Sequence, residues 1–274
     1  MNFELILCLL TLVSGIFWVL IAVIKRVTQG SRFFQPKLWP RYIREPFEFL
    51  ASLFPVFLMV FLFRSFLYEP FVIPSGSLEP TLEIGDFVLV NKFDYGLRKP
   101  ISHEVMLPIS DPKRGEIMVF LNPRNPRIYF IKRVIGLPGD RISYVNKILY
   151  INGKEMPQIV LGSRDRTAQN RRYGFIEERQ ENLDGVVHNI LVRPNASEQD
   201  YYDIQIPPKH YFVMGDNRDD SDDSRYWGTV PDHHIVGRAR YIWFSWDTQT
   251  SNWLKKIRFN RMFKSIQQSS KEPL

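Results

Sequence analysis

The chain has 274 residues, enough for one sizeable domain with membrane anchors or for two small domains, and its 45% apolar and 24% charged residues exclude a disordered chain. The formal charge of +7 suits nucleic acid or an anionic membrane, but the basic residues form no long run, so nucleic acid is not expected as a partner. Cys8 is the single cysteine, which excludes an intramolecular disulfide and a zinc site built from cysteines.

The first apolar block covers residues 3–24. About 20 helical residues, each rising roughly 1.5 Å, cross a hydrocarbon core of about 30 Å. A cleavable signal peptide is the alternative, but it needs a basic start, whereas this block begins with Glu4 and is followed by Lys25 and Arg26. We therefore predict an uncleaved transmembrane helix within residues 1–24.

A second apolar block covers residues 47–68. A buried helix of a soluble core is its alternative. Arg64 lies near enough to one end of the block for its guanidinium to reach lipid headgroups, and Pro55 is tolerated in membrane helices. The block therefore predicts a second transmembrane helix.

The loop between the blocks, residues 25–46, decides the orientation. It carries six basic residues and one acid, Glu45. Short basic loops stay in the cytoplasm, so both ends of the chain are expected on the far side, in the periplasm or outside the cell. The basic side chains of the loop are also able to contact anionic lipid.

After residue 68, short segments rich in Val, Ile, Phe and Tyr alternate with turn residues, the pattern of β-strands. They are residues 87–90, 116–121, 127–136, 141–145, 148–151, 211–214 and 235–243. Turn signals stand at Pro138-Gly139-Asp140 and Asn152-Gly153. Few segments show a helical period, so the predicted fold class is a mostly β catalytic domain, residues 69–151 and 209–245, preceded by two transmembrane α-helices.

Two regions of the chain lack this pattern. Residues 152–208 are polar and weakly patterned, and they are predicted to form an inserted subdomain. Residues 246–274 form a basic tail. An amphipathic segment on a membrane surface and a solvated tail are both open interpretations of that tail.

The segment from Pro74 to Pro80, Pro-Ser-Gly-Ser-Leu-Glu-Pro, follows the second apolar block closely. A Ser-Gly-Ser turn leading into a strand is common and by itself indicates no chemistry. Gly76, however, lets the backbone approach a ligand closely, and the two prolines restrict the motion of a nucleophile between them. The segment is therefore a candidate nucleophile loop.

Lys132 lies within a segment that otherwise has the pattern of a buried strand. It could face solvent by simple alternation. A serine hydroxyl, however, needs a base, and a lysine is a base only when neutral, a state that burial in apolar surroundings favours. Phe130, Ile131 and Val134 supply such surroundings, while Arg133 should point to the opposite face of the strand.

Residues 215–228 contain five aspartates and two arginines. A calcium loop is one interpretation, but the spacing does not follow the EF-hand pattern. An ion-pair network that fixes strand ends around a buried site fits the mixed charges better. We expect no metal ion and no cofactor.

Together these segments resemble the signature boxes of bacterial type I signal peptidases, also called leader peptidases. Residues 75–82 resemble the nucleophile box, 131–140 the lysine box, 215–228 the closing acidic box and 113–120 a structural box. Two apolar blocks before the first box match the layout of Gram-negative members. The resemblance covers about residues 1–150 and 209–245, and it implies a β-rich fold with an extended hairpin, in the bacterial inner membrane, with a periplasmic catalytic domain.

The resemblance also implies a role for individual residues. Ser77 attacks the scissile carbonyl, and Lys132 is its neutral general base and later the acid for the leaving amine. The hydroxyl of Ser75 and the backbone N–H of Ser77 form the oxyanion hole. Ser221 hydrogen-bonds and orients the lysine, and Asp223 and Arg225 form a supporting ion pair.

The substrates that the resemblance implies are signal peptides of secreted preproteins, cut after a small-x-small pattern such as Ala-x-Ala. The peptide would add as a strand beside the nucleophile loop and the lysine strand. Membrane lipid is the other expected partner. The side chains expected to line shallow substrate pockets are Phe71, Ile73, Pro74, Phe130 and Ile131.

The sequence departs from the family pattern at three points. Leu78 stands where Met is frequent, which should matter little because the two side chains are similar in size. Asp222 stands where a small residue is usual, and its charge would favour the ammonium form of Lys132 if the two lie close together. The region 152–208 has no cysteine, so a disulfide known in some relatives is absent.

Four other kinds of protein compete with this interpretation. A self-cleaving Ser/Lys repressor domain is cytosolic, which the two apolar blocks disfavour, and a catalytically inactive scaffold is disfavoured because every expected catalytic residue is present. A zincin would need His-Glu-x-x-His, which does not occur. A Ser-His-Asp hydrolase would need a histidine in a chemical motif, and none of the five is in one: His103, His188, His210, His233 and His234.

Overall fold

The computed structural model describes residues 3–29, 41–100, 104–165, 174–196, 200–247, 250 and 256–266. These residues belong to two units. The first is a helical unit, Met1–Tyr68 with Lys99–Ser102, and the second is a β domain, Glu69–Arg98 with His103–Leu274.

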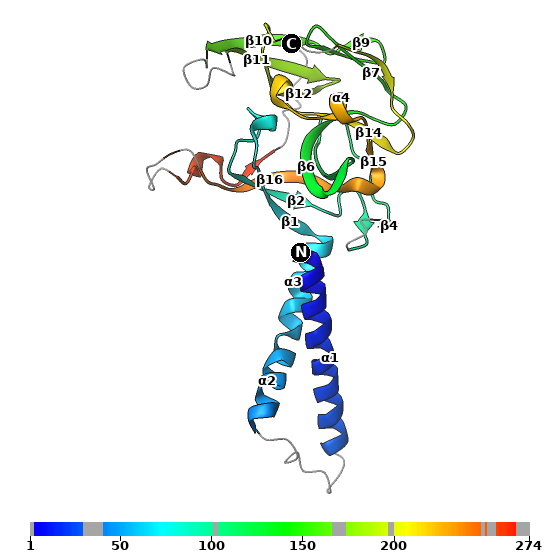
Figure 1. Ribbon diagram of the computed structural model, residues 1–274, viewed down its shortest axis with the longest axis vertical. Helices are drawn as coiled ribbons and strands as arrows, with labels where there is room; N and C mark the ends of the chain where they lie inside the picture. Colours follow the sequence, from blue (N-terminus) through cyan, green and yellow to red (C-terminus); the bar gives the residue numbers. More distant parts are fainter. Residues whose placement is uncertain are drawn as a thin grey trace. The chain divides into compact units, whose positions relative to one another are not determined.

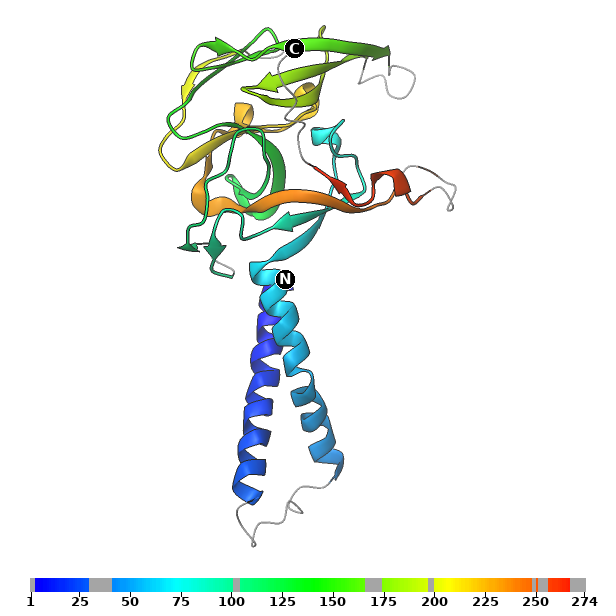
Figure 2. The ribbon, with the colours of Figure 1, turned by 180° about the vertical axis from the view of Figure 1, so that it is seen from behind.

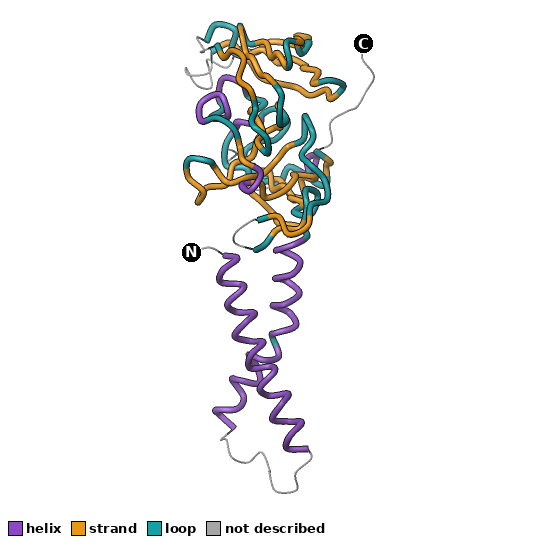
Figure 3. Tube along the Cα trace, turned by 90° about the vertical axis from the view of Figure 1, so that its right-hand side faces the viewer, coloured by secondary structure: helices purple, strands orange, loops and turns teal. Residues whose placement is uncertain are grey.

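The helical unit contains α1 (Phe3–Gln29), α2 (Arg41–Ser52) and α3 (Phe54–Phe66). Two stretches, Glu4–Val27 and Glu45–Phe66, are long and apolar enough to cross a membrane by length and composition, as predicted. The second stretch is not one continuous helix, because a turn at Leu53 separates α2 from α3 (Figure 3). Pro55 explains this break, since proline has no N–H and its ring clashes with the carbonyl of the residue four positions earlier.

The large sheet of the β domain is antiparallel and confirms the predicted mostly β fold class. Its strands run in the order β1-β2-β16-β5-β6-β14-β15, and β17 pairs with β16. The bounds are β1 (Tyr68–Val72), β2 (Asp86–Asn91), β5 (Ile117–Asn122), β6 (Asn125–Gly136), β14 (His210–Met214), β15 (Val230–Pro231), β16 (Ile235–Ser245) and β17 (Lys264–Ser265). Figure 1 shows β16 running past β2 and β6. This sheet carries both the nucleophile loop and the lysine strand.

Smaller sheets complete the domain. One has the order β13-β7-β8-β9, another β10-β11-β12, and β3 pairs with β4. The bounds are β3 (Leu97–Arg98), β4 (Val105–Leu107), β7 (Arg141–Val145), β8 (Ile148–Ile151), β9 (Lys154–Glu155), β10 (Gln158–Asp165), β11 (Phe175–Leu183), β12 (Val186–Val192) and β13 (Tyr201–Gln205). Asn152 and Gly153 have φ of 53° and 77°, so they form the predicted tight turn between β8 and β9.

The region 152–208, predicted as an insert, is therefore ordered into strands over its described residues. β10, β11 and β12 lie side by side in Figure 1 and form a long antiparallel sheet. β13 pairs with β7, a strand of the region 69–151. Helix α4 (Ser224–Trp227) and the short 3₁₀ helices η2 (Gly76–Leu78), η3 (Arg218–Asp220), η4 (Asp232–His234) and η6 (Phe259–Arg261) connect the sheets.

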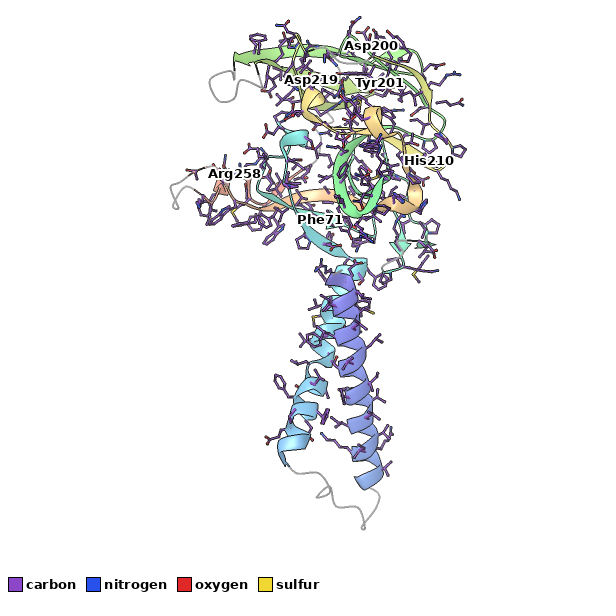
Figure 4. All side chains as sticks on the ribbon, viewed as in Figure 1. Phe71, Asp200, Tyr201, His210, Asp219 and Arg258 are labelled. Carbon is purple, nitrogen blue, oxygen red and sulfur yellow. The ribbon has the colours of Figure 1, made fainter. Side chains whose placement is uncertain are left out.

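The basic C-terminal region, residues 246–274, is described at 246–247, 250 and 256–266, and the segment 256–266 contacts the β domain. Arg258 donates to Glu83 at 2.6 Å, and Arg261 donates to Asp86 at 2.6 Å and to Glu83 at 2.9 Å. This segment is drawn in red in Figure 2, and Arg258 is labelled in Figure 4. Residues 256–266 are thus part of the domain, and residues 248–249, 251–255 and 267–274 lie outside the described part of the chain.

Candidate active site

The nucleophile loop is a short 3₁₀ turn, η2, which follows β1. Ser75 precedes the turn in extended conformation, and Ser77 within the turn is only 8% exposed. Asn217 holds the loop from outside: its backbone N–H donates to Ser77 O at 3.1 Å and its Nδ2 donates to Gly76 O at 3.1 Å. These bonds fix the backbone that carries the Ser77 hydroxyl.

Lys132 lies on β6 opposite Met118 of β5 and is 5% exposed. Its Nζ donates to Ser77 Oγ at 2.6 Å, although the two residues are 55 positions apart. Burial lowers the pKa of Lys132 from 10.5 to about 8, while the charges of Asp223 and Asp222 raise it and that of Arg225 lowers it. The fold therefore places a readily deprotonated amine against a serine hydroxyl.

Ser75 and Ser221 take different positions beside this pair. Ser75 is exposed, and its Oγ donates to Ser77 Oγ at 3.5 Å. Ser221 Oγ is buried and has no hydrogen-bond partner among the described residues. The predicted hydrogen bond from Ser221 to Lys132 is therefore not formed in this structure.

Gly215 marks the closest approach between the acidic segment and the nucleophile loop. A Cβ on Gly215 would lie 2.4 Å from Ser77 O and 2.3 Å from Ser221 Oγ. Only hydrogen fits this space, so no larger residue is possible here without moving the nucleophile.

Asp223 and Arg225 form a buried ion pair next to Gly215. Arg225 donates through Nε to Asp223 Oδ1 at 2.9 Å and through its NH2 group to Oδ2 at 2.9 Å. Asp223 also accepts from the Gly215 N–H at 3.0 Å. Arg225 and this N–H hold the pKa of Asp223 below its usual value despite its burial, so it stays ionised and fixes Gly215.

The residues predicted to contact substrate do not form one group. Phe71, Ile73 and Ile131 share a hydrophobic cluster, in which Ile73 is almost fully buried. Phe130 packs against a different cluster, with Phe120 and Trp227 as neighbours, and Pro74 is exposed. Alternation along β6 explains why Phe130 and Ile131 separate. Phe71, labelled in Figure 4, comes from β1 and stacks edge-on against Tyr129 of β6 at 5.3 Å.

Comparison with known proteins identifies the family of the chain. A family model described as signal peptidase, peptidase S26, matches residues 47–246. The chain belongs to this family. It is 45% identical over 237 residues to signal peptidase I of Pseudomonas aeruginosa, covering 79% of this chain and 80% of that protein. It is 34% identical to signal peptidase I of Haemophilus influenzae, covering 97% of this chain and 92% of that protein.

Among solved structures, the crystal structure of a signal peptidase I from Enterococcus faecalis is 32% identical, with a TM-score of 0.32, and covers 47% of this chain and 97% of that one. Family membership makes this chain a serine endopeptidase of the signal peptidase kind and a membrane-associated protein.

Arg133 and Asp216 were not predicted as site residues. Arg133 is fully buried and forms a bidentate pair with Asp216, in which Nε to Oδ1 and NH2 to Oδ2 are both 2.6 Å. Thr81 donates to Asp216 Oδ2 at 2.6 Å. One arginine next to Lys132 thereby holds the acidic segment, and the acidic segment holds the far end of the nucleophile loop. An arginine inside an apolar strand, beside the lysine, was the available signal.

A third buried ion pair links the sheet β10-β11-β12 to the acidic segment. Arg218 donates to Glu181 of β11 at 2.8 Å. His188 of β12 lies 3.5 Å from Glu181 and 3.8 Å from Asp216 through Nε2. Burial, together with Arg133 and Arg218, holds the pKa of His188 well below its usual value, so the ring is neutral. No sequence pattern indicated that these distant residues meet.

The five aspartates of the acidic segment do not form a metal site. Asp216 and Asp223 pair with arginines, and Asp219 pairs with Lys147 and accepts from the Arg193 backbone N–H at 2.6 Å. Figure 4 labels Asp219 near the strands of the region 152–208. Within the described part of the chain, no group of three or more His, Cys, Asp or Glu is placed to hold a metal ion.

Asp222→Asn is expected to shift the rise of kcat/KM with pH towards lower pH. Asp222 is exposed, and its charge raises the pKa of Lys132. A neutral lysine is the active form, so activity rises with pH through this pKa, and a lower pKa moves the rise to lower pH. The gain below pH 8 should be about two-fold, because solvent screens exposed charges. Asp220→Asn, a neighbouring exposed aspartate, is the matched control, and identical profiles for wild type and Asp222→Asn would contradict the prediction.

Proposed function

We propose that the chain removes signal peptides from exported preproteins by means of a Ser77/Lys132 dyad. The contact of 2.6 Å between Lys132 Nζ and Ser77 Oγ supports the proposal most directly. Lys132 is also buried, and burial lowers its pKa. This supports the proposal further, since an ordinary lysine would be protonated and unable to accept a proton.

In the proposed reaction, neutral Lys132 accepts the proton of the Ser77 hydroxyl as Oγ attacks the scissile carbonyl. The oxyanion that forms accepts hydrogen bonds from the Ser77 N–H and the Ser75 hydroxyl. Each such donor is worth about 3 kcal/mol in the transition state. The ammonium of Lys132 then gives its proton to the leaving amine. In the second half, neutral Lys132 activates the water that hydrolyses the acyl-enzyme.

In this proposal Ser221 and the ion pair of Asp223 with Arg225 support the lysine rather than react. Ser221 is buried beside Gly215 and would orient Lys132 through a hydrogen bond that forms when substrate is bound. Asp223 acts through its charge and through the Gly215 N–H.

The proposed substrate is an extended peptide with small residues on both sides of one variable residue, as in Ala-x-Ala. β1 ends the large sheet, so its outer edge is available for a further strand. Phe71 and Ile131, which share one hydrophobic cluster, would line one shallow pocket, and Phe130, on the opposite face of β6, would line a second. Both pockets would reject large side chains.

The test uses the full-length protein in detergent with a preprotein whose signal ends in Ala-x-Ala. A matched preprotein carries Phe in place of the final Ala. We expect cleavage after the final Ala in the first substrate and a loss of about 100-fold or more in the second, since a pocket cannot accept several extra carbons without strain. Equal cleavage of the two would remove small-residue specificity from the proposal.

We further propose that the protein spans the bacterial inner membrane twice, with residues 25–46 in the cytoplasm and the β domain in the periplasm. The two apolar stretches, Glu4–Val27 and Glu45–Phe66, and the basic residues between them support this orientation. A protease added to intact spheroplasts should digest the β domain and leave residues 25–46 protected. The reverse pattern, with cytoplasmic markers intact, would invert the topology.

A further inference from the structure

Strand β12 is a backbone partner of the acidic segment, residues 215–228. The N–H of Leu191 donates to Asp216 O at 2.8 Å, and Leu191 forms a parallel bridge with Asn217. The N–H of Arg193 donates to the carboxylate of Asp219 at 2.6 Å. The end of β12, which belongs to the region 152–208, therefore runs along the acidic segment.

The same residues of the acidic segment contact the nucleophile loop. The N–H of Asn217 donates to Ser77 O at 3.1 Å. Thr81, at the far end of the loop, donates to Asp216 Oδ2 at 2.6 Å. The stretch 216–219 thus connects β12 to the nucleophile loop, and a displacement of this stretch would move the backbone that carries the Ser77 hydroxyl.

One charged side chain ties this stretch to β11. Arg218 donates to Glu181 Oε1 at 2.8 Å through one NH2 group and to Oε2 through the other, and both side chains are fully buried. Gln158 of β10 donates to the same Oε1 at 2.9 Å. A bidentate pair fixes orientation as well as distance. Glu181 therefore holds the side chain of Arg218 in one position on the sheet.

The ring of His188 lies beside both carboxylates of this buried region. Its Nε2 is 3.5 Å from Glu181 and 3.8 Å from Asp216. Burial and the two arginines, Arg133 and Arg218, keep the pKa of His188 low and the ring neutral. A neutral ring does not draw either carboxylate away from its arginine. Glu181 thus stays with Arg218, and Asp216 stays with Arg133.

We propose that Glu181 of β11 is a positioning residue for the peptidase reaction, which holds Arg218 and, through the stretch 216–219, fixes the nucleophile loop. The proposal rests on the proposed dyad, because it assigns Glu181 an effect on the placement of Ser77. A nucleophile misplaced by about 1 Å loses up to about 100-fold in rate. The backbone bonds to β12 remain when the ion pair is lost, so we expect a smaller loss, about 10-fold in kcat.

The test measures kcat, KM and thermal unfolding of the full-length protein in detergent, with a preprotein whose signal ends in Ala-x-Ala. Glu181→Gln removes the charge that holds Arg218, but it leaves a buried arginine unpaired and can fail to fold. Glu181→Met/Arg218→Met is therefore measured beside it, because apolar side chains often replace a buried ion pair without loss of stability. Asp203→Asn is the matched control, since Asp203 forms a bidentate pair with Arg141 that is exposed and outside this region.

We expect each folded variant without Glu181 to lose about 10-fold in kcat with KM close to that of the wild type, because the ion pair contacts neither predicted substrate pocket. Glu181→Asp keeps a carboxylate for Arg218 and should recover most of the loss, and the control should match the wild type. Wild-type kcat in the folded double variant would reduce the ion pair to a structural role and overturn the proposal. A rise in KM with unchanged kcat would overturn it as well.

Ser77→Ala is assayed in the same series, so that the positioning role and the dyad are tested separately. An active Ser77→Ala enzyme would contradict the proposed dyad. Wild-type kcat in the variants without Glu181, beside an inactive Ser77→Ala enzyme, would overturn the positioning role and leave the dyad in place.

Discussion

Ser77→Ala is expected to lower kcat for cleavage of a preprotein by about 10⁴-fold or more, the order of loss when serine proteases lose a member of their catalytic group. The Ser77 Oγ is the only hydroxyl within 2.6 Å of Lys132 among the described residues, so no other group there is placed to form the acyl-enzyme. The change removes one oxygen from a loop whose backbone Asn217 holds through Ser77 O and Gly76 O. The fold should therefore be unaffected, and kcat is measured on the purified full-length protein.

Two further variants test whether the loss of kcat is specific to the Ser77 hydroxyl. Ser163→Ala replaces an exposed serine of β10 and should leave kcat unchanged. Ser75→Ala removes one proposed oxyanion donor and should cost about 10²-fold, since such a donor is worth about 3 kcal/mol. If Ser77→Ala kept turnover near the wild-type level with an unchanged thermal unfolding curve, Ser77 would not be the nucleophile.

Local signals explain which strands the sequence predicts well. β7 and β8 are predicted at their observed bounds, because both are rich in β-branched and aromatic residues, and Asn152-Gly153 marks the turn that follows β8. Such signals depend on neighbours in the chain, which the sequence displays directly. The break between α2 and α3 has a local cause as well, but Pro55 alone does not distinguish a tolerated proline from one that ends a helix.

The strand β10 is hard to predict for a physical reason. Ile159, Val160 and Leu161 of β10 are consecutive and each about half exposed, and a register shift follows Val160. Alternation arises when one face of a strand is buried and the other is solvated. In a strand exposed on both faces, the residues of the two faces do not differ in polarity, so its sequence lacks the alternation that predicts a strand.

The two reacting residues can be predicted from the sequence, but the ion pairs that hold the surrounding segments in place cannot. Ser77 and Lys132 stand in motifs whose chemistry is visible in the sequence alone. The pairs Arg133–Asp216 and Arg218–Glu181 join residues 83 and 37 positions apart, and the sequence offers many acids to each arginine. Only the paired strands decide which carboxylate is within reach, because β14 places Met214 opposite Arg133 and thereby brings Asp216 to it.

Lys132→Arg and Lys132→Met are both expected to be inactive, with opposite effects on stability. A guanidinium stays protonated at every working pH, and a thioether has no basic lone pair, so neither variant activates Ser77. Wild-type kcat/KM should rise with pH through about 8, the pKa to which burial lowers Lys132. An active Lys132→Arg enzyme would contradict a neutral lysine as the base.

The stability difference follows from the same pKa. Lowering it from 10.5 to about 8 costs the folded state roughly 3 kcal/mol at neutral pH, because each unit is worth about 1.4 kcal/mol. The unfolded chain binds more protons between pH 8 and 10.5, so the stability of the wild type rises with pH across this window and is lowest below it. Lys132→Met removes the buried charge and, after the loss of one hydrogen bond worth about 1 kcal/mol, should gain about 2 kcal/mol at pH 7 and nothing near pH 10.5. Lys132→Arg keeps a buried positive charge that deprotonation does not remove, so this variant should be less stable than wild type at both pH 7 and pH 10.5.

Thermal unfolding in detergent at pH 7 and pH 10.5 separates these cases. Lys154→Met, a replacement of an exposed lysine, is the control and should leave the unfolding temperature unchanged at pH 7. If Lys132→Met unfolded at the wild-type temperature at pH 7, burial would not disfavour the ammonium, and the reason for a neutral base would be lost. A more stable but inactive Lys132→Met would instead show that the fold tolerates a destabilising residue at β6 because the chemistry of Ser77 requires it, as expected where a catalytic group is held in an environment that opposes its charge.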